Sequence, residues 1–228
     1  MTPFGWRFMG TFFGVLMLPL MYAFLKKLYG GGAVPVLGTL VFAADFMHFV
    51  QTRIATIDTY GVFFILLMYY FMYIWLSEDR LWALALSGLS FGLGAASKWI
   101  CLYAGAGLGV LWLLHWLRRF LRPAEGERVF PAFAKNAAFC LLFFVALPGL
   151  IYYLSYLPYG AARQVQPFTR EYWDIVWDNQ TYMFSYHAKL VATHPYASRW
   201  YEWMLNIRPI LYSWRRARRA SASASRLS

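Results

Sequence analysis

Long apolar runs, separated by short charged or glycine-containing segments, occupy the first two thirds of the sequence. These runs are Phe8–Leu25, Leu28–Phe49, Thr59–Leu76, Leu81–Ser97, Trp99–Leu117 and Asn136–Tyr156. A helix needs about 20 mainly apolar residues to cross the hydrocarbon core of a bilayer. The pattern therefore predicts an all-α integral membrane protein with about six transmembrane helices.

The pattern changes after Pro158, where polar and aromatic residues replace the apolar runs. Trp173, Trp177 and Tyr186 are typical of this part, and such amphipathic rings favour the interface between membrane and water. The last residues form a basic, low-complexity Ser/Ala tail, which we expect to be disordered. We therefore predict a transmembrane bundle at 1–157, an extracytoplasmic or interfacial segment at 158–212 and a tail at 213–228.

Composition supports the membrane class and argues against a nucleic-acid partner. Only 14% of the residues are charged, against about 25% in soluble domains. The formal net charge of +11 comes from basic residues that gather at the ends of apolar runs and in the tail, as in membrane orientation signals. The lipid bilayer is thus the first predicted partner. Cys101 and Cys140 lie inside apolar runs without the spacing of a metal or redox motif.

The basic residues also predict an orientation. Eight lysines and arginines lie on the side of the membrane that follows the first span, whereas the short loops opposite hold only Arg7, Arg53 and Lys98. An excess of Lys and Arg marks the cytoplasmic side. Arg53, Asp58 and Lys98 are therefore expected together on the extracytoplasmic face.

Arg53 and Lys98 are the candidate phosphate-binding residues. A guanidinium presents a fork of donors and an ammonium a compact charge, and both suit a lipid-linked phosphate. For a single Lys or Arg near a membrane, snorkelling toward the interface is the commoner explanation. Asp58 could form an ion pair with Arg53, bind a sugar hydroxyl, or serve as the N-cap of the third span.

Four further polar residues are candidates for a supporting role. Asp45 and His48 are three residues apart, which places them on one face of a helix, where a mutually satisfied polar pair is favoured over a metal site. His187 and His194 are seven apart without cysteine or carboxylate companions, so a zinc site there is disfavoured. We predict no metal and no cofactor.

Several segments, in order along the chain, carry a resemblance to a known enzyme family. They are Asp45–Tyr60, Ala96–Trp99, Tyr103–Gly107, Tyr186–His187, Thr193–Tyr196, Ser198–Trp200, Glu202–Trp203 and Arg208–Pro209. Together they resemble the bacterial branch of the dolichyl-phosphate-mannose protein mannosyltransferases, which are multispanning glycosyltransferases of the GT-C class. The resemblance extends from about Pro3 to Tyr212.

The resemblance implies transfer of mannose from polyprenyl-phosphate mannose to a Ser or Thr hydroxyl of an acceptor protein, outside the cytoplasm and without an obligatory metal. The lipid-linked sugar is then a substrate rather than a cofactor. Arg53, with Lys98 and Asp58, would bind the donor and stabilise charge on the departing phosphate. Asp45, His48, His187 and His194 would support that site.

The sequence departs from the family in its catalytic base. Family members carry an additional first span and an extracytoplasmic loop with an Asp-Glu pair, and this sequence contains no Asp-Glu dipeptide. We therefore expect an internal fragment that binds the donor and is inactive alone, with its catalytic residue unassigned. Two alternatives remain open: a transporter or assembly subunit that uses Asp45 and His48 inside the membrane, and a GT-C transferase for another lipid-linked sugar.

Overall fold

The computed structural model describes residues 2–54, 56–190, 199–202 and 207. It divides into two units, Met1–Val176 and Trp177–Ser228, and most of the helices lie in the first. The predicted tail at 213–228 lies outside the described residues. Throughout the described ranges the secondary structure is helical, without a strand, which confirms the predicted all-α class.

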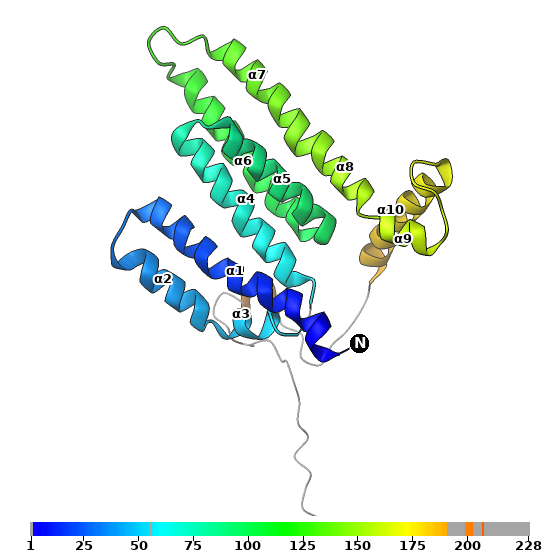
Figure 1. The fold of residues 1–228 in the computed structure, drawn as a ribbon. Helices are drawn as coiled ribbons and strands as arrows, with labels where there is room; N and C mark the ends of the chain where they lie inside the picture. The colour runs from blue at the N-terminus through cyan, green and yellow to red at the C-terminus, as the bar shows by residue number, and fades with distance from the viewer. Residues whose placement is uncertain (1, 55, 191–198, 203–206, 208–228) are drawn as a thin grey trace, which may run out of the picture. The chain divides into compact units, whose positions relative to one another are not determined.

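The chain begins with a helical hairpin. Helix α1 (Pro3–Tyr29) and helix α2 (Ala33–Ala44) lie side by side and antiparallel (Figure 1). Gly30 and Gly32 in the turn have φ values of 81° and 99°, a backbone conformation that residues with a side chain rarely adopt. The short helix α3 (Phe46–Gln51) follows α2 directly.

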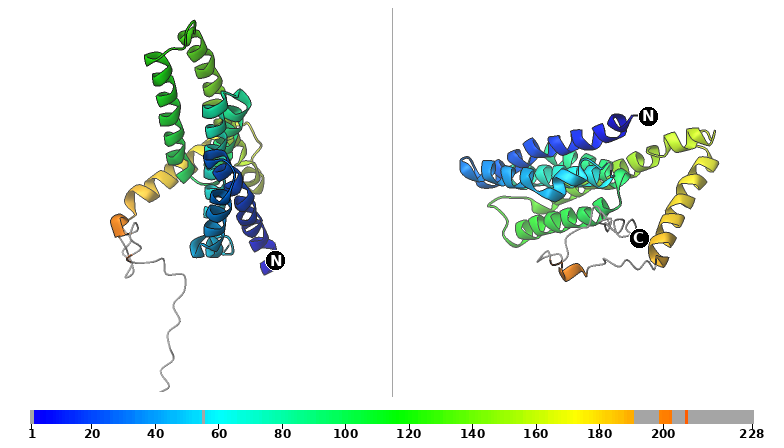
Figure 2. Two further views of the ribbon diagram at one scale, coloured as in Figure 1. Left: turned by 90° about the vertical axis from the view of Figure 1, so that its left-hand side faces the viewer. Right: turned by 90° about the horizontal axis from the view of Figure 1, so that it is seen from below.

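Three helices form the core of the first unit: α4 (Asp58–Glu78), α5 (Leu81–Ser97) and α6 (Ile100–Leu121). Met72, Trp75 and Leu84 are almost completely buried between them. The small residue Ser87 lets α5 approach α4 closely, and its hydroxyl donates a hydrogen bond of 2.8 Å to the carbonyl of Met68. Successive helices run in opposite directions along the bundle (Figure 1), and α1 and α2 lie next to each other in the views of Figure 2 as well.

A long helical stretch closes the bundle. It consists of α7 (Val129–Leu141), the π-helical turn η1 (Leu142–Ala146), α8 (Leu147–Leu154) and α9 (Leu157–Ala162). Pro148, which has no N–H to donate, follows the π-helical turn and accounts for the irregular hydrogen bonding there. Helix α10 (Arg170–Lys189) and the 3-10 turn η2 (Trp200–Glu202) come last.

The membrane class is confirmed, but the predicted number of six spans is not. In the described part of the chain, four helical stretches are long and apolar enough to cross a bilayer: Phe4–Tyr29, Asp58–Glu78, Ile100–Leu121 and Val129–Ala162. Helices α2 and α5, with 12 and 17 residues, are shorter apolar helices. The prediction of one span over Leu28–Phe49 was wrong, because the helix ends at Ala44 and turns at Asp45.

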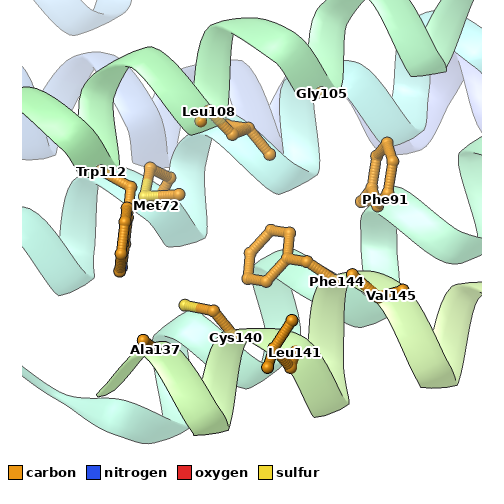
Figure 3. A pocket seen from close by; sticks show the side chains of 11 residues that line it. Met72, Phe91, Gly105, Leu108, Trp112, Ala137, Cys140, Leu141, Phe144 and Val145 are labelled. Atoms are coloured by element: carbon orange, nitrogen blue, oxygen red, sulfur yellow. The ribbon is translucent and has the colours of Figure 1, made fainter. Parts of the chain in front are cut away.

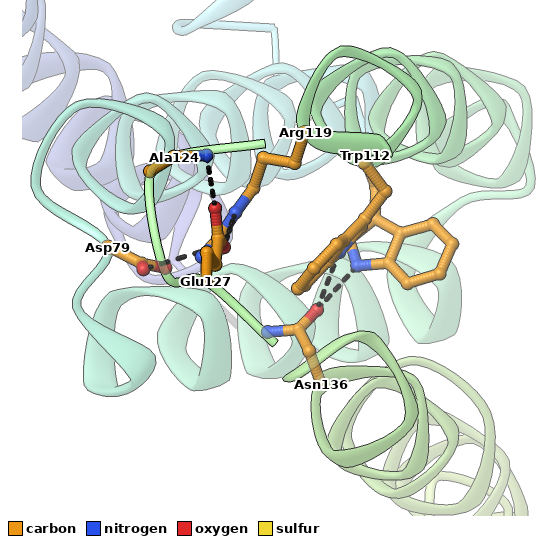
Figure 4. A network of polar contacts seen from close by, with 7 residues as sticks. Asp79, Trp112, Arg119, Ala124, Glu127 and Asn136 are labelled. Carbon is orange, nitrogen blue, oxygen red and sulfur yellow. Dashed lines mark hydrogen bonds and ion pairs between the residues drawn. The ribbon is translucent and has the colours of Figure 1, made fainter. Parts of the chain in front are cut away.

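Charged residues hold together the end of the bundle where α1 ends, which we call the cationic end (Lys26, Lys27, Arg80, Arg118, Arg119, Arg122, Arg128 and Lys135). Arg119 of α6 donates through Nε to Glu127 in the α6–α7 loop at 2.8 Å and contacts Asp79 of the α4–α5 turn at 3.5 Å (Figure 4). Hydrogen bonds from the Ala124 backbone and from Arg119 lower the pKa of the Glu127 carboxyl, which is therefore ionised at neutral pH. Arg119 thus connects two turns that are far apart in the sequence.

The opposite end of the bundle collects α3, the start of α4 and the turn between α5 and α6, and we call it the site end (Asp45, His48, Arg53, Asp58 and Lys98). Helix α3 is fixed there by contacts with α1. Gly14 of α1 is buried against Thr52, and the Thr11 hydroxyl donates to the Thr52 carbonyl at 3.3 Å. A β-carbon at Gly14 would lie 2.5 Å from Cγ2 of Thr52, which is closer than two non-bonded carbon atoms approach in proteins. The position of α3 therefore depends on glycine at this place.

The first prediction concerns this contact. Replacing Gly14 by alanine should lower the free energy of unfolding by about 1–3 kcal/mol, the usual cost of overpacking, because α3 and α1 must move apart. The matched control is Gly5→Ala in the same helix, where the nearest atom to the new β-carbon is Oγ1 of Thr2 at 3.8 Å. Thermal unfolding in detergent measures both. Equal stability of the two variants would contradict the packing argument.

Candidate functional site

Asp45 forms the corner between α2 and α3. Its backbone is extended, with φ −65° and ψ 122°, and its carboxylate accepts a hydrogen bond of 2.7 Å from the backbone N–H of His48. Asp45 is thus the N-cap of α3, a role for which aspartate is well suited. The expectation that Asp45 and His48 share one face of a continuous helix was wrong, because the helix breaks at Asp45.

His48 lies in the first turn of α3 and faces the protein. Its ring contacts Phe42, with centroids 4.5 Å apart, and forms a hydrogen bond to the backbone of Gly14. Burial lowers the pKa of this imidazole below its ordinary value of 6.5, although Asp45 and the hydrogen bond to Gly14 act in the opposite direction. His48 is therefore neutral at pH 7, and its contribution to stability decreases as the pH falls below 6.5.

Arg53 follows the end of α3 with an exposed side chain. Its guanidinium carbon lies 4.7 Å from the ring centroid of Phe49, four residues earlier, in a cation–π contact. Among the described residues Arg53 has no carboxylate partner. The predicted ion pair of Asp58 with Arg53 is therefore not present. Because the side chain is exposed, the donors of this guanidinium are accessible from outside the protein.

Asp58 pairs with Lys98 instead. The carboxylate of Asp58, in the first turn of α4, accepts from the ammonium of Lys98, which follows the end of α5. Asp58 is not the N-cap, since that position belongs to Ile57, but a negative charge in the first turn is favourable to the helix dipole. The side chains are 43% and 33% exposed, so solvent weakens the pair and allows either group to reach a ligand.

The turn that carries Lys98 is held by contacts with two helices, α8 and α4. The indole N–H of Trp99 donates to the Tyr152 hydroxyl at 3.0 Å, which joins the turn to α8. The thiol of Cys101 lies 3.6 Å from the Gly61 carbonyl of α4. Sequence reasoning missed these contacts because the partners belong to different spans. It could have found Phe49, since side chains four residues apart are neighbours on a helix.

The support of the site by two histidines stays a prediction. His187 is exposed on α10, with its ring 5.4 Å from that of Tyr186, and belongs to the second unit. His194 lies outside the described residues, so the zinc alternative is not tested. Within the ranges that the structure describes, no group of three His, Cys, Asp or Glu side chains could hold a metal ion.

Comparisons with known proteins identify relatives of this chain. Curated relatives named polyprenol-phosphate-mannose–protein mannosyltransferase are 24% identical to the chain in Corynebacterium glutamicum and in Mycolicibacterium smegmatis. Both alignments cover 92% of this chain but only 49% and 48% of the relatives, so the chain spans about half of their length. No solved structure matches the chain. The sequence profile of dolichyl-phosphate-mannose-protein mannosyltransferase matches residues 1–159, and the chain therefore belongs to this family.

Proposed function

We propose that this chain binds the polyprenyl-phosphate mannose used by a protein O-mannosyltransferase, and that the complete enzyme transfers the mannose to Ser or Thr hydroxyls of acceptor proteins. The names of the curated relatives support the donor and the protein acceptor. The chain spans about half of the length of these relatives, so the transfer reaction of the whole enzyme is also proposed here and not shown by the names.

The observation that carries the proposal is the state of Arg53. Its guanidinium is exposed at the site end, is oriented by the Phe49 ring and has no carboxylate partner among the described residues. A planar fork of donors in this state matches the oxygens of a phosphate, which it can bind with two parallel hydrogen bonds. The phosphate of the donor lipid is therefore proposed to bind at Arg53.

The reaction explains why a cation is needed there. As the bond between mannose and phosphate breaks, negative charge develops on the departing polyprenyl phosphate. A preorganised cation that contacts these oxygens stabilises the transition state more than the ground state. Arg53 is proposed to supply this charge. Lys98 adds a second cation and Asp58 holds its ammonium in place.

Proton transfer is not assigned to this chain. The acceptor hydroxyl must lose its proton as it attacks the anomeric carbon, which requires a base on the side opposite the leaving phosphate. The sequence contains no Asp-Glu dipeptide. The proposal therefore gives the chain the binding of the donor and predicts no turnover by the chain alone.

The proposed orientation places the site end outside the cytoplasm. The cationic end holds the excess of Lys and Arg that marks a cytoplasmic side. The bundle separates this end from Arg53 and Lys98, because α4 and α6 both run from one to the other. A sugar bound at the site end would then meet acceptor proteins that have crossed the membrane.

The second prediction tests Arg53. In nanodiscs, Arg53→Ala should weaken the binding of polyprenyl-phosphate mannose at least about tenfold, since hydrogen bonds to a charged group contribute about 1.5–3 kcal/mol. Arg53→Lys should retain part of the affinity, because it keeps the charge but loses the fork. Native mass spectrometry with increasing donor measures the affinity.

Arg7→Ala is the matched control for Arg53. Arg7 is also exposed, and its guanidinium carbon lies 4.7 Å from the centroid of the neighbouring Trp6 ring. Loss of this arginine removes the same charge and the same kind of cation–π contact, but from α1. If both variants lost affinity equally, general attraction between the protein and an anionic lipid would explain the result, and the role of Arg53 would be refuted.

The third prediction distinguishes the contribution of Lys98 to lipid binding from that of Asp58. Lys98→Met should weaken the binding of both polyprenyl phosphate and polyprenyl-phosphate mannose about fivefold, the effect of a half-exposed ion contact of about 1 kcal/mol. Asp58→Asn, which releases the ammonium, should leave the binding of polyprenyl phosphate unchanged or stronger. Titration of each variant with the two lipids measures this difference. Unchanged affinities in Lys98→Met would limit the ion pair to a structural role.

A further inference from the structure

An apolar pocket of about 420 Å³ lies inside the bundle of the first unit, between α6 and the stretch α7–η1. Figure 3 shows the side chains of Phe91, Leu108, Trp112 and Phe144 around it, and Met72 behind them. Ligand pockets in proteins have volumes of about 300–1,000 Å³, and an apolar cavity of about 150 Å³ already binds benzene. The pocket is thus large enough for a ligand.

The pocket is open because α6 has glycine, and therefore no side chain, at two of the positions that face it. At the loop between them, α6 and α7 are in contact through the rings of Trp112 and Phe133, with centroids 5.5 Å apart. Further along, Gly105 and Gly109 of α6 line the pocket, and a β-carbon at Gly109 would meet no atom within 4 Å. On the opposite side of the pocket, the π-helical turn η1 has a wider backbone turn than the α-helices on either side of it. The gap therefore follows from the sequence of both helices.

The chemistry of the lining selects a hydrocarbon. The indole N–H of Trp112 already donates to Oδ1 of Asn136 at 2.7 Å, and the Cys140 thiol lies 3.7 Å from the same oxygen. A sugar, a phosphate or water would gain no hydrogen bond from these groups and would lose those it makes in water. An apolar ligand has no such cost.

The surroundings indicate where this hydrocarbon comes from. Leu141 and Val145 at the rim are 64% and 62% exposed, and both lie in a stretch long and apolar enough to span a bilayer. The medium at this depth is the acyl chains of membrane lipids, which are far more abundant there than any other apolar molecule. Mass action therefore favours a bilayer lipid as the occupant.

We propose that the pocket between α6 and α7–η1 is a binding site for one acyl chain of a membrane phospholipid. The chain fills the space that Gly109 leaves open and contacts the rings of Phe91 and Phe144. The lipid stays in the leaflet with its headgroup at the membrane surface and makes no use of Arg53. This site is independent of the proposed binding of the mannose donor.

The fourth prediction tests the site by filling it. The full chain, purified in mild detergent with dioleoyl phosphatidylethanolamine, should retain one phospholipid in native mass spectrometry. Gly109→Leu should decrease the retained fraction at least tenfold, because its side chain enters the empty space. Ala137→Leu should have the same effect from α7. Gly149→Leu in α8 is the control, since its β-carbon also meets nothing within 4 Å but it does not line the pocket.

Equal retention of phospholipid by Gly109→Leu, Ala137→Leu and Gly149→Leu would overturn the proposal. So would retention of polyprenyl phosphate, and not of phospholipid, that depends on Gly109. A measurement on the unaltered chain guards against variants that do not fold. A phospholipid with a diazirine on its acyl chain should, after washing, label the peptide around Cys140 several-fold more than the exposed segment around Val15 of α1, and equal labelling would refute the site.

Discussion

A polar group inside a bilayer must find its partner within the protein, and this constraint arranges the whole bundle. At membrane depth the hydroxyl of Tyr69 donates to the Ala104 carbonyl at 2.9 Å, and Asn136 accepts from two indoles of α6. Among the described residues two buried nitrogens, of Trp75 and His115, lack a hydrogen-bond partner, and their rings contact each other with centroids 4.7 Å apart. Ionised side chains are displaced to the two ends. Arg53 is one of these displaced cations, exposed at the site end and without a carboxylate partner among the described residues.

Close packing between helices connects this arrangement to the candidate site. In a bilayer, helices associate through van der Waals contact and hydrogen bonds, so small residues determine which helices can approach. A β-carbon at Gly88 would lie 2.4 Å from the carbonyl oxygen of Phe143, which shows how near α5 comes to η1. Gly14 has the same function between α1 and α3. The contact at Gly88 holds α5 against η1, and the contact at Gly14 holds the short helix that precedes Arg53. The position of Arg53 therefore depends on glycines that have no reactive side chain.

The sequence predicted most of the helices but not the corners between them. Apolar runs ended by charge located α4, α5 and α6 to within a few residues, because in a membrane protein burial in lipid and helix formation produce the same signal. The break at Asp45 was missed, since an aspartate within an apolar run can either stay in a helix or cap a new one, and the tertiary contact of α3 with Gly14 decides. The pairing of Asp58 with Lys98 rather than Arg53 was missed for a similar reason: the partners are 40 residues apart. The amino-acid sequence alone does not say which of these residues contact each other.

Arg53 and Lys98, the two cations of the site end, differ in whether a phosphate would have to compete with a carboxylate for them. Lys98 already has a carboxylate partner, so a phosphate there must share the ammonium with Asp58 or displace it, and the two anions repel each other. In the described part of the chain Arg53 contacts the face of the Phe49 ring and has no carboxylate partner, which leaves the edge of the guanidinium and its donors uncovered. The phosphate is therefore expected to bind first at Arg53. In the proposed donor site, Asp58 would keep the charge of Lys98 largely neutralised until an anion binds, and would limit the repulsion between the two cations.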